Sequence, residues 1–411
     1  MSLHSDANHI MEAALGAARP DEAVRRALSG LHLAEKGKCI LVAIGKAAWQ
    51  MADAACAILG DRLDDGIVIT KYGHAMGALP HLTIREAGHP VPDENSFSAT
   101  EEAIGLVKNL GEQDTVIFLI SGGGSALFEK PLIPSKELER LTKGLLACGA
   151  DIVEINTIRK RLSAVKGGRF AQICAPARVV LVVLSDIIGD PLDMIASGPA
   201  YPDSSSSEQA LAIVQKYRLE LSESSLSLLM QETPKSLQNV ETHITGSVRQ
   251  LCRAAEEAAA QLGYKPLVLT ASLCCTARDA GSFLASIAQY YSDCDSSLAF
   301  ITGGETVVKL IGTGLGGRNQ EIALSAVPGI AGLRETAVFS LGSDGTDGPT
   351  DAAGGYCDNT TLTRLRAAGV APIAALDNND AYHALEKVDG LIKTGPTGTN
   401  VNDVSVLLIR R

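Results

Sequence analysis

The stretch from Thr302 to Glu321 reads TGGETVVKLIGTGLGGRNQE and contains two groups of glycines. Between them, the β-branched run Thr306 to Ile311 predicts a short strand. Glycine is disfavoured inside helices and strands because it loses more backbone freedom on folding than any other residue. Glycines at this density therefore indicate loops whose N–H groups approach a ligand closely, and a run of such groups binds anions.

Arg318 follows the last glycine pair, and Asn319 to Glu321 open a helical pattern. A helix start offers unpaired N–H groups and the positive end of the helix dipole, and an arginine adds a bidentate cation. We interpret the stretch as a phosphate-binding loop. The alternative is a tight turn followed by a helix with a surface arginine, since glycine loops are common in turns.

The length and composition indicate a two-domain α/β protein. A chain of 411 residues exceeds the usual size of a single hydrophobic core. Residues 219 to 240 are polar and serine-rich, so we expect a Rossmann-like parallel-sheet domain over residues 1–238 and a second α/β domain over 239–411. Whether the final strand, Val404 to Ile409, returns to the first domain is left open. We expect the active site in the cleft between the domains.

Charge and cysteine content exclude several classes of function. The net charge of −11 argues against nucleic-acid binding, which requires basic patches. Nine scattered cysteines without metal-binding spacing indicate free thiols in a reducing compartment, hence a cytoplasmic protein. No apolar run approaches the roughly 18 residues of a membrane span, and no signal-peptide pattern opens the chain.

The opening βα unit places a lysine where ligands gather. Lys38 to Ile44 is a buried-strand pattern, followed by Gly45-Lys46 and an alanine-rich helix that continues to about Leu59. Ligands of parallel sheets bind at the carboxyl ends of the strands. A cation at a helix start is disfavoured, so Lys46 indicates a nearby anion. The alternative is a solvated lysine.

A second candidate phosphate loop, SGGGS, follows the predicted strand Asp114 to Ile120. It lacks the GKS or GKT of a P-loop and the third glycine of a dinucleotide fingerprint. Together with the opening stretch, it supplies the predicted cofactor-binding residues Ser121, Gly122, Gly123, Gly124, Ser125, Gly303, Gly304, Glu305, Gly316, Gly317 and Asn319.

Asp186 and Asp190 follow the predicted strand Arg178 to Leu184. Carboxylates at the end of a strand near phosphate loops suit Mg²⁺. We predict Asp186 as the first metal ligand, and Asp190 either joins it or caps the next turn.

The candidates for substrate binding carry cationic or amide side chains: His89, Arg159, Lys166 and Asn400. His89 either contacts substrate or fills a turn. Arg159 and Lys166 belong to a cationic run that is otherwise read as a solvated helix face.

Ten motifs in order resemble the class II glycerate kinases, the MOFRL family, which also carries the older label hydroxypyruvate reductase. The motifs are IGKA (44–47), GHPVPDENS (88–96), LISGGGSAL (119–127), INTIRK (155–160), KGGR (166–169), LSDIIGDPLDMIASGPAYPD (184–203), TGGET (302–306), GTGLGGRNQE (312–321), SDGTDGPTDAAGG (343–355) and TGPTGTNVND (394–403). The chain departs at Leu273 to Thr276, LCCT, where the family leads us to expect a Gly-Glu pair.

The resemblance implies a kinase that uses ATP and Mg²⁺ to phosphorylate D-glycerate, with 2-phosphoglycerate favoured over 3-phosphoglycerate as product. It also implies that Lys46 and Arg318 are the key catalytic residues. We expect a monomer or homodimer. Cations around the transferring phosphoryl group suit such a reaction, which depends on positioning and charge stabilisation. The general base is left open among Asp186, Asp190 and Glu305.

Two other functions compete with this reading. A nicotinamide-dependent reductase of hydroxypyruvate or tartronate semialdehyde should have a G-x-G-x-x-G loop after a strand and an acidic residue about 20 residues later. We expect no stretch of this sequence to combine such a loop after a strand with the acidic residue. A non-catalytic nucleotide or sugar-phosphate binder is the second alternative.

Overall fold

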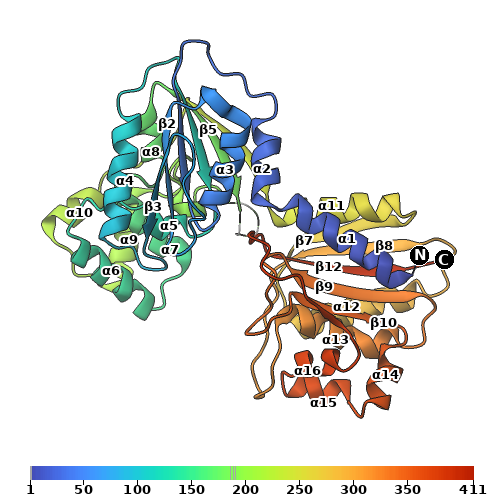
Figure 1. The fold of residues 1–411 in the computed structure, drawn as a ribbon. Helices are drawn as coiled ribbons and strands as arrows, with labels where there is room; N and C mark the ends of the chain where they lie inside the picture. The colour runs from blue at the N-terminus through green and yellow to red at the C-terminus, as the bar shows by residue number, and fades with distance from the viewer. Residues whose placement is uncertain (1, 186, 188, 190) are drawn as a thin grey trace. The chain divides into compact units, whose positions relative to one another are not determined.

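The computed structural model describes residues 2–185, 187, 189 and 191–411, which form two compact units (Figure 1). The parallel-sheet domain comprises Ala23–Leu184 and Asp190–Thr245. The mixed-sheet domain comprises Met1–Glu22, Ser185–Gly189 and Gly246–Arg411. No helix of the described residues has the length and apolar character needed to cross a membrane.

The parallel-sheet domain contains one six-stranded sheet in the order β3-β2-β1-β4-β5-β6. Every residue of β1 and β4 is buried, as expected for strands covered on both faces, and this explains their continuous apolar sequences, CILVAI and TVIFLI. The strands are β1 (Cys39–Ile44), β2 (Asp65–Lys71), β3 (Leu82–Ala87), β4 (Thr115–Ile120), β5 (Arg178–Leu184) and β6 (Val240–Gly246). The helices are α2 (Pro20–Leu28), α3 (Ala48–Leu59), α4 (Glu94–Val107), α5 (Gly124–Leu127), α6 (Ser135–Ala147), α7 (Ile152–Arg161), α8 (Arg169–Cys174), α9 (Ser207–Tyr217) and α10 (Glu223–Leu229).

The mixed-sheet domain has six strands in the order β11-β10-β9-β12-β8-β7. Only β7 and β8 pair in parallel; β12 runs antiparallel to both β8 and β9. The strands are β7 (Lys265–Leu273), β8 (Leu298–Gly304), β9 (Thr336–Gly342), β10 (Gly354–Asp358), β11 (Leu391–Ile392) and β12 (Asp403–Ile409). The helices are α1 (Leu3–Ala17), α11 (Val248–Gln261), α12 (Ala277–Tyr290), α13 (Arg318–Ile330), α14 (Thr361–Ala367), α15 (Pro372–Asp377) and α16 (Ala381–Glu386).

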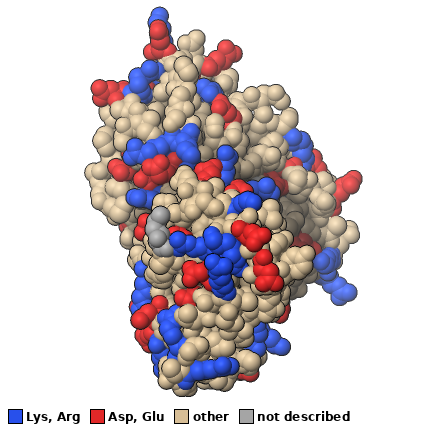
Figure 2. Space-filling view, turned by 90° about the vertical axis from the view of Figure 1, so that its right-hand side faces the viewer, with Lys and Arg blue, Asp and Glu red and all other residues tan. Residues whose placement is uncertain are grey.

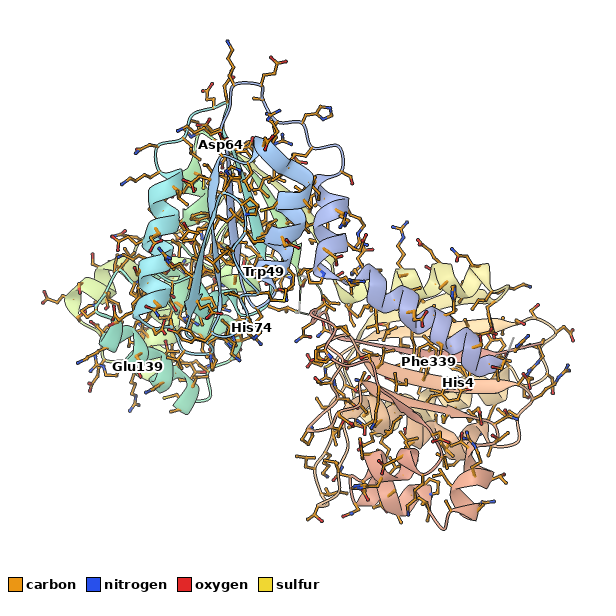
Figure 3. All side chains as sticks on the ribbon, viewed as in Figure 1. His4, Trp49, Asp64, His74, Glu139 and Phe339 are labelled. Carbon is orange, nitrogen blue, oxygen red and sulfur yellow. The ribbon has the colours of Figure 1, made fainter. Side chains whose placement is uncertain are left out.

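The N-terminal helix belongs to the mixed-sheet domain. The Tyr264 hydroxyl lies 2.7 Å from the buried Asp6 carboxylate. The His4 ring packs edge-on against Tyr356 with centroids 4.9 Å apart, on the sheet that also carries the buried Phe339 (Figure 3). An amphipathic helix can cover whichever sheet face is apolar, so its position in the sequence does not decide its domain.

The predicted division into residues 1–238 and 239–411 is therefore wrong in two places. Helix α1 lies in the second unit, and β6, although it follows the polar segment, is the edge strand of the first sheet. The final strand does not return to the first domain, because β12 pairs between β8 and β9.

The expected strand at Thr306–Ile311 is also wrong. The segment is a loop whose only ladder contact is an isolated bridge between Thr276 and Val307. Thr306 is buried, but most of the apolar side chains are exposed, with Val307 56% and Leu310 80% exposed.

Charged side chains of both signs are interspersed on the face drawn in Figure 2. Typical surface pairs are Arg85 with Glu102 and Lys143 with Glu139, whose side chains are 40–72% exposed. Such exposed pairs contribute little to stability, on the order of 0–1 kcal/mol.

Candidate functional site

The strand order of the parallel sheet reverses between β1 and β4. From β1 the chain adds β2 and β3 on one side, whereas β4, β5 and β6 extend the sheet on the other. In open α/β sheets, ligands bind outside the carboxyl ends of strands at such a switch point. Gly45-Lys46 follows β1, and the loop Ser121–Ser125 follows β4, so the topology brings the two predicted loops together.

Lys46 and His89 both lie beside the glycine loop. The Lys46 N–H donates to the Gly122 carbonyl at 2.8 Å, and the Ala47 N–H donates to Ser121 Oγ at 3.1 Å. Gly123 has a φ of +90°, and a Cβ there would lie 3.0 Å from His89 Cδ2 and 3.3 Å from Lys46 Cγ. Only glycine fits this position, whereas the Lys46 side chain is exposed.

The loop has the electrostatics of an anion site. Burial lowers the pKa of His89, and the nearby charges of Lys46, Lys71 and His74 lower it further. His74 Nδ1 lies 3.1 Å from the Lys46 carbonyl. In the described structure, the N–H groups of residues 122–125 donate to no protein acceptor. Consecutive open amides beside concentrated positive charge suit a phosphate or carboxylate.

Buried cations hold this loop from beneath. Lys166 Nζ donates to the carbonyls of Ser125 at 2.9 Å and Phe128 at 3.0 Å, and Arg159 Nη2 donates to the Ser125 carbonyl at 3.1 Å. The Glu129 carboxylate lies 3.4 Å from Arg159 and 3.6 Å from Lys166. The Lys166 side chain is fully buried, and burial lowers its pKa to about 8.

The prediction that Lys166 binds substrate directly is thus wrong, because its ammonium has no exposed surface and is used by the loop backbone. Arg159 keeps 15% of its side chain exposed, and its buried Nε has no partner in the described structure. Its role in substrate binding stays a prediction.

The reading of the cationic run as a solvated helix face is wrong as well. Lys160 Nζ lies 3.0 Å from Asp203 Oδ1, and Arg161 Nη1 donates to Ser205 Oγ at 2.8 Å. Although burial raises the pKa of Asp203, the Thr233 hydrogen bond and the Lys160 charge bring it below its usual value. These charges form a buried network between α7 and the segment after η2 (Ile195–Ser197).

The predicted metal ligands, Asp186 and Asp190, lie outside the described residues. Within the described ranges, no group of three or more His, Cys, Asp or Glu side chains could hold a metal ion. Mg²⁺ usually takes only one or two protein carboxylates and completes its shell with water and phosphate oxygens. The two aspartates that follow β5 in the sequence have that donor chemistry.

In the mixed-sheet domain, α13 begins at Arg318, one residue before the predicted helix opening at Asn319, and Gly317 is its N-cap. Arg318 pairs bidentately with Asp403 at the start of β12, with Nε–Oδ2 at 2.5 Å and Nη2–Oδ1 at 3.0 Å. Its Nη1 lies 3.2 Å from Glu305 Oε1, just beyond β8. The guanidinium is fixed yet remains about one-third exposed, 34% of its side chain.

Some N–H groups at the start of α13 already donate to a protein carboxylate and are not available to a phosphate. Asp347 accepts from the N–H groups of Asn319 at 3.1 Å and Gln320 at 2.9 Å, and burial raises its pKa to about 6. Asn319 is fully buried, and its Nδ2 also lies 3.3 Å from Asp347. The prediction that Asn319 contacts cofactor is therefore wrong. Only the N–H groups of residues 316–318 are left without an acceptor in the described structure.

Gly303 and Gly304 are buried in β8. A Cβ on Gly304 would lie 2.2 Å from the Leu273 carbonyl oxygen, so this glycine permits close strand packing. Both glycines take part in strand pairing, and their predicted cofactor role stays a prediction. Asn400 is exposed on the loop before β12, and its role stays a prediction.

A pocket of about 800 Å³ lies beside the Arg318 cluster. It gathers the predicted residues Glu305, Gly316, Gly317 and Arg318. The lining residues that were not predicted as site residues are Cys274, Thr306, Val307, Val308, Leu310, Gly312, Thr313, Gly314, Glu321, Gly348, Pro349, Asn379 and Ala381. The sequence offered little indication of these residues, because some come from distant parts of the chain. Asn379, for example, lies 67 residues beyond Gly312, and its Oδ1 accepts from the N–H groups of Ile311 and Gly312, both at 2.8 Å.

The run Gly312–Gly317, GTGLGG, has the G-x-G-x-x-G spacing by itself. It follows the loop at residues 306–311 rather than a strand. The structural context of a dinucleotide fingerprint, which opens a βα unit, is therefore missing.

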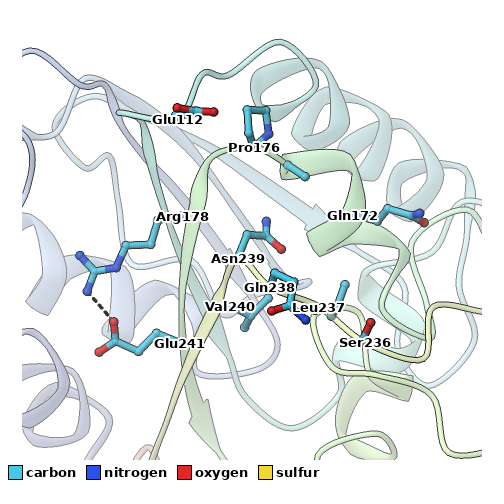
Figure 4. A pocket seen from close by; sticks show the side chains of 11 residues that line it. Glu112, Gln172, Pro176, Arg178, Ser236, Leu237, Gln238, Asn239, Val240 and Glu241 are labelled. Atoms are coloured by element: carbon cyan, nitrogen blue, oxygen red, sulfur yellow. Dashed lines mark hydrogen bonds and ion pairs between the residues drawn. The ribbon is translucent and has the colours of Figure 1, made fainter.

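A second pocket, of about 690 Å³, lies at the amino ends of strands in the parallel sheet (Figure 4). Arg178 and Val240, at the amino ends of β5 and β6, line it. Arg178 is paired with Glu241 at 2.5 Å. The pocket lies opposite the switch point, so we do not assign it to the reaction.

The comparisons agree with this two-domain α/β architecture. The family model described as Domain of unknown function (DUF4147) matches residues 6–230, and the model of the MOFRL family matches residues 298–403. Over 414 aligned residues, the chain is 51% identical to a D-glycerate 2-kinase of Thermotoga maritima, with 99% of each chain covered. A crystal structure of a glycerate kinase from Thermotoga maritima superposes with a TM-score of 0.94 at 51% identity, covering 98% of this chain and 99% of that chain.

An Agrobacterium vitis protein named "Putative hydroxypyruvate reductase" is 39% identical and covers 97% of this chain and 93% of its own. Domain architecture and full-length similarity together define the class as the two-domain α/β kinases of small hydroxy acids. The chain belongs to the glycerate 2-kinase family, with its MOFRL module in the C-terminal half.

We predict that Lys160→Met lowers the free energy of unfolding by about 3–5 kcal/mol, because it leaves Asp203 buried without its ammonium partner. Urea unfolding followed by fluorescence of Trp49, the only tryptophan, reports on the same domain. Lys143→Met is the matched control: its exposed pair with Glu139 should contribute no more than about 0.5 kcal/mol. Equal effects of the two substitutions would contradict the buried network.

We predict that the imidazole of His89 titrates below 6.5, its ordinary pKa. Lys46→Met should raise the pKa of His89, because a neighbouring positive charge disfavours the imidazolium. NMR titration of the histidine ring resonances measures both values, and the exposed Lys36→Met serves as the control. An unchanged pKa in Lys46→Met would show that the two side chains are not electrostatically coupled.

Proposed function

We propose that this protein is a D-glycerate 2-kinase that transfers the γ-phosphoryl group of ATP to the C2 hydroxyl of D-glycerate. The observation that carries the proposal is the cluster at the switch point: Lys46, His89 and four open amides from Gly122 to Ser125, gathered on one edge of the parallel sheet. Full-length similarity to a D-glycerate 2-kinase at 51% identity supports the substrate.

The Lys46 loop of the parallel-sheet domain and the Arg318 site of the mixed-sheet domain both supply groups that phosphoryl transfer requires. Charge develops on the phosphate oxygens, and the rate depends on donors that are already oriented toward it. The Lys46 ammonium and the amides of residues 122–125 would bind phosphate or carboxylate oxygens. Arg318, fixed by Asp403, would add a planar cation that can contact two oxygens at once.

We also propose that Mg²⁺ accompanies ATP, with Asp186 and Asp190 as the protein carboxylates that hold it. When bound, the ion neutralises charge on the phosphate oxygens. Carboxylates that follow a strand at the switch edge of the sheet support this assignment. The base that accepts the hydroxyl proton is kept open, with Glu305 as the described candidate, 3.2 Å from Arg318. The cytoplasmic location and the oligomeric state, monomer or homodimer, stay predictions.

Reduction of hydroxypyruvate is the competing activity, suggested by the name of the Agrobacterium vitis relative. The only glycine spacing that resembles a dinucleotide fingerprint within the described chain follows a loop rather than a strand. A coupled assay with ATP, Mg²⁺ and D-glycerate should give turnover, whereas NADH oxidation with hydroxypyruvate should not. NADH oxidation without ATP-dependent turnover would refute the proposal.

Proton-coupled phosphorus NMR of the product tests which hydroxyl is phosphorylated. A phosphate ester on C2 couples to one proton and gives a doublet. An ester on C3 couples to two protons and gives a triplet, which would contradict the 2-kinase assignment.

We predict that Lys46→Ala and Arg318→Ala each lower kcat by about 10²–10³-fold, because each removes a positioned donor to the transferring group. Thermal unfolding of Lys46→Ala should change little, since the Lys46 side chain is exposed. Arg318→Ala should also lower the Tm, because it leaves the buried Asp403 carboxylate without its partner, so its kcat is measured on the folded fraction. The exposed Lys36→Ala and Arg253→Ala serve as controls and should retain kcat. A large loss of Tm with a normal kcat in the folded fraction would contradict these roles.

A further inference from the structure

The pocket of the mixed-sheet domain is lined by two chemically different sets of groups. Val307, Val308 and Leu310 of the loop after β8 and Pro349 are apolar. Gly316, Gly317 and Arg318 contribute N–H groups that have no acceptor among the described residues, and Arg318 adds its guanidinium. An exposed apolar cluster beside a concave surface marks a binding site more often than a bare surface.

The polar groups of the pocket indicate a built site. Thr306 is 4% exposed, and its buried Oγ1 has no hydrogen-bond partner in the described structure. Glu321 is 5% exposed, and its carboxylate lines the same pocket. A buried hydroxyl without a partner is costly, so its retention points to a ligand that supplies the missing hydrogen bond.

Hydrogen bonds with Asn379 and Asp380 hold the loop that contributes to the pocket. Asn379 Oδ1 accepts from the N–H groups of Ile311 and Gly312, both at 2.8 Å, and its Nδ2 donates to the Lys309 carbonyl at 3.1 Å. Asp380 Oδ1 accepts from the Leu315 N–H at 3.0 Å. The loop therefore keeps its apolar side chains presented to the pocket although no strand pairs with it.

We infer that this pocket binds the nucleoside end of the phosphoryl donor. The base packs against Leu310 and its apolar neighbours, the Thr306 hydroxyl and Glu321 carboxylate bind polar groups of the base or ribose, and the phosphate chain leads to the amides of Gly316 and Gly317 and to Arg318. The pocket volume of about 800 Å³ accommodates a nucleotide. The inference rests on the proposed kinase function and adds the position of the donor.

Calorimetric titration of the full chain with ADP, without D-glycerate, tests the inference. Leu310→Asp places a charge where the base packs and should raise the Kd for ADP by about tenfold or more, while the KM for D-glycerate stays within about twofold of wild type. Thr306→Val, which removes only the hydroxyl, should weaken ADP binding without loss of Tm. Ile373→Asp is the matched control, since Ile373 is 64% exposed in the same domain and does not line this pocket.

Thiol labelling gives a second readout. Cys274 is exposed and lines the pocket, whereas Cys148 is exposed in the other domain. ADP should slow maleimide labelling of Cys274 and leave the labelling of Cys148 unchanged.

An unchanged ADP Kd in Leu310→Asp, or an absence of ADP binding by the wild-type chain, would overturn the inference. Failure of the kinase function is distinguishable, because it appears as absent phosphorylation of D-glycerate while ADP binding and its loss in Leu310→Asp are still measured.

Discussion

The ion pair between Arg318 and Asp403 joins the start of α13 to the start of β12. It is bidentate, with both contacts at 3.0 Å or less, and one-third of the arginine side chain stays exposed. Burial raises the pKa of Asp403 and the charge of Arg318 opposes that rise. The paired carboxylate gives the guanidinium one orientation, so a ligand would meet a cation that needs no rearrangement. The glycine loop, the pocket and the helix start are arranged around this fixed group.

The same principle operates in the parallel-sheet domain. Glu129 is buried and lies within 3.6 Å of both Arg159 and Lys166, which hold the carbonyls of the loop after β4. The N–H groups of residues 122–125, beside Lys46, have no acceptor among the described residues. In both domains, buried carboxylates pair with cations or helix N–H groups: Glu129 in one domain, and Asp347 and Asp403 in the other. The remaining N–H groups and cations are available to a ligand. The cost of burying these charges is offset by their pairing and hydrogen bonds.

Sequence reasoning predicted the elements whose signals are local. The apolar runs of β1 and β4 were found within one residue of their ends, and the start of α13 at Arg318 follows from the glycine pair before it. The carboxylates that complete the site come from distant positions: Asp347 lies 28 residues beyond Asn319, and Asp403 lies 85 residues beyond Arg318. The order of charged residues along the sequence does not reveal which distant residues pair in the fold. This is why Lys160 and Arg161 resembled a solvated face, and why Thr306–Ile311 resembled a strand although no neighbouring strand was available to it.

The most direct test of this account is the kcat of Asp403→Asn for ATP-dependent phosphorylation of D-glycerate, measured at saturating substrates beside its Tm. The substitution keeps the size of the side chain but removes the charge and one acceptor that orient Arg318. We expect kcat to fall by up to about a hundredfold, since a misplaced catalytic group can cost that much, while the Tm changes little because Glu305 still pairs with the guanidinium. A kcat within twofold of wild type in a normally folded Asp403→Asn protein would contradict the claim that this ion pair organises the site.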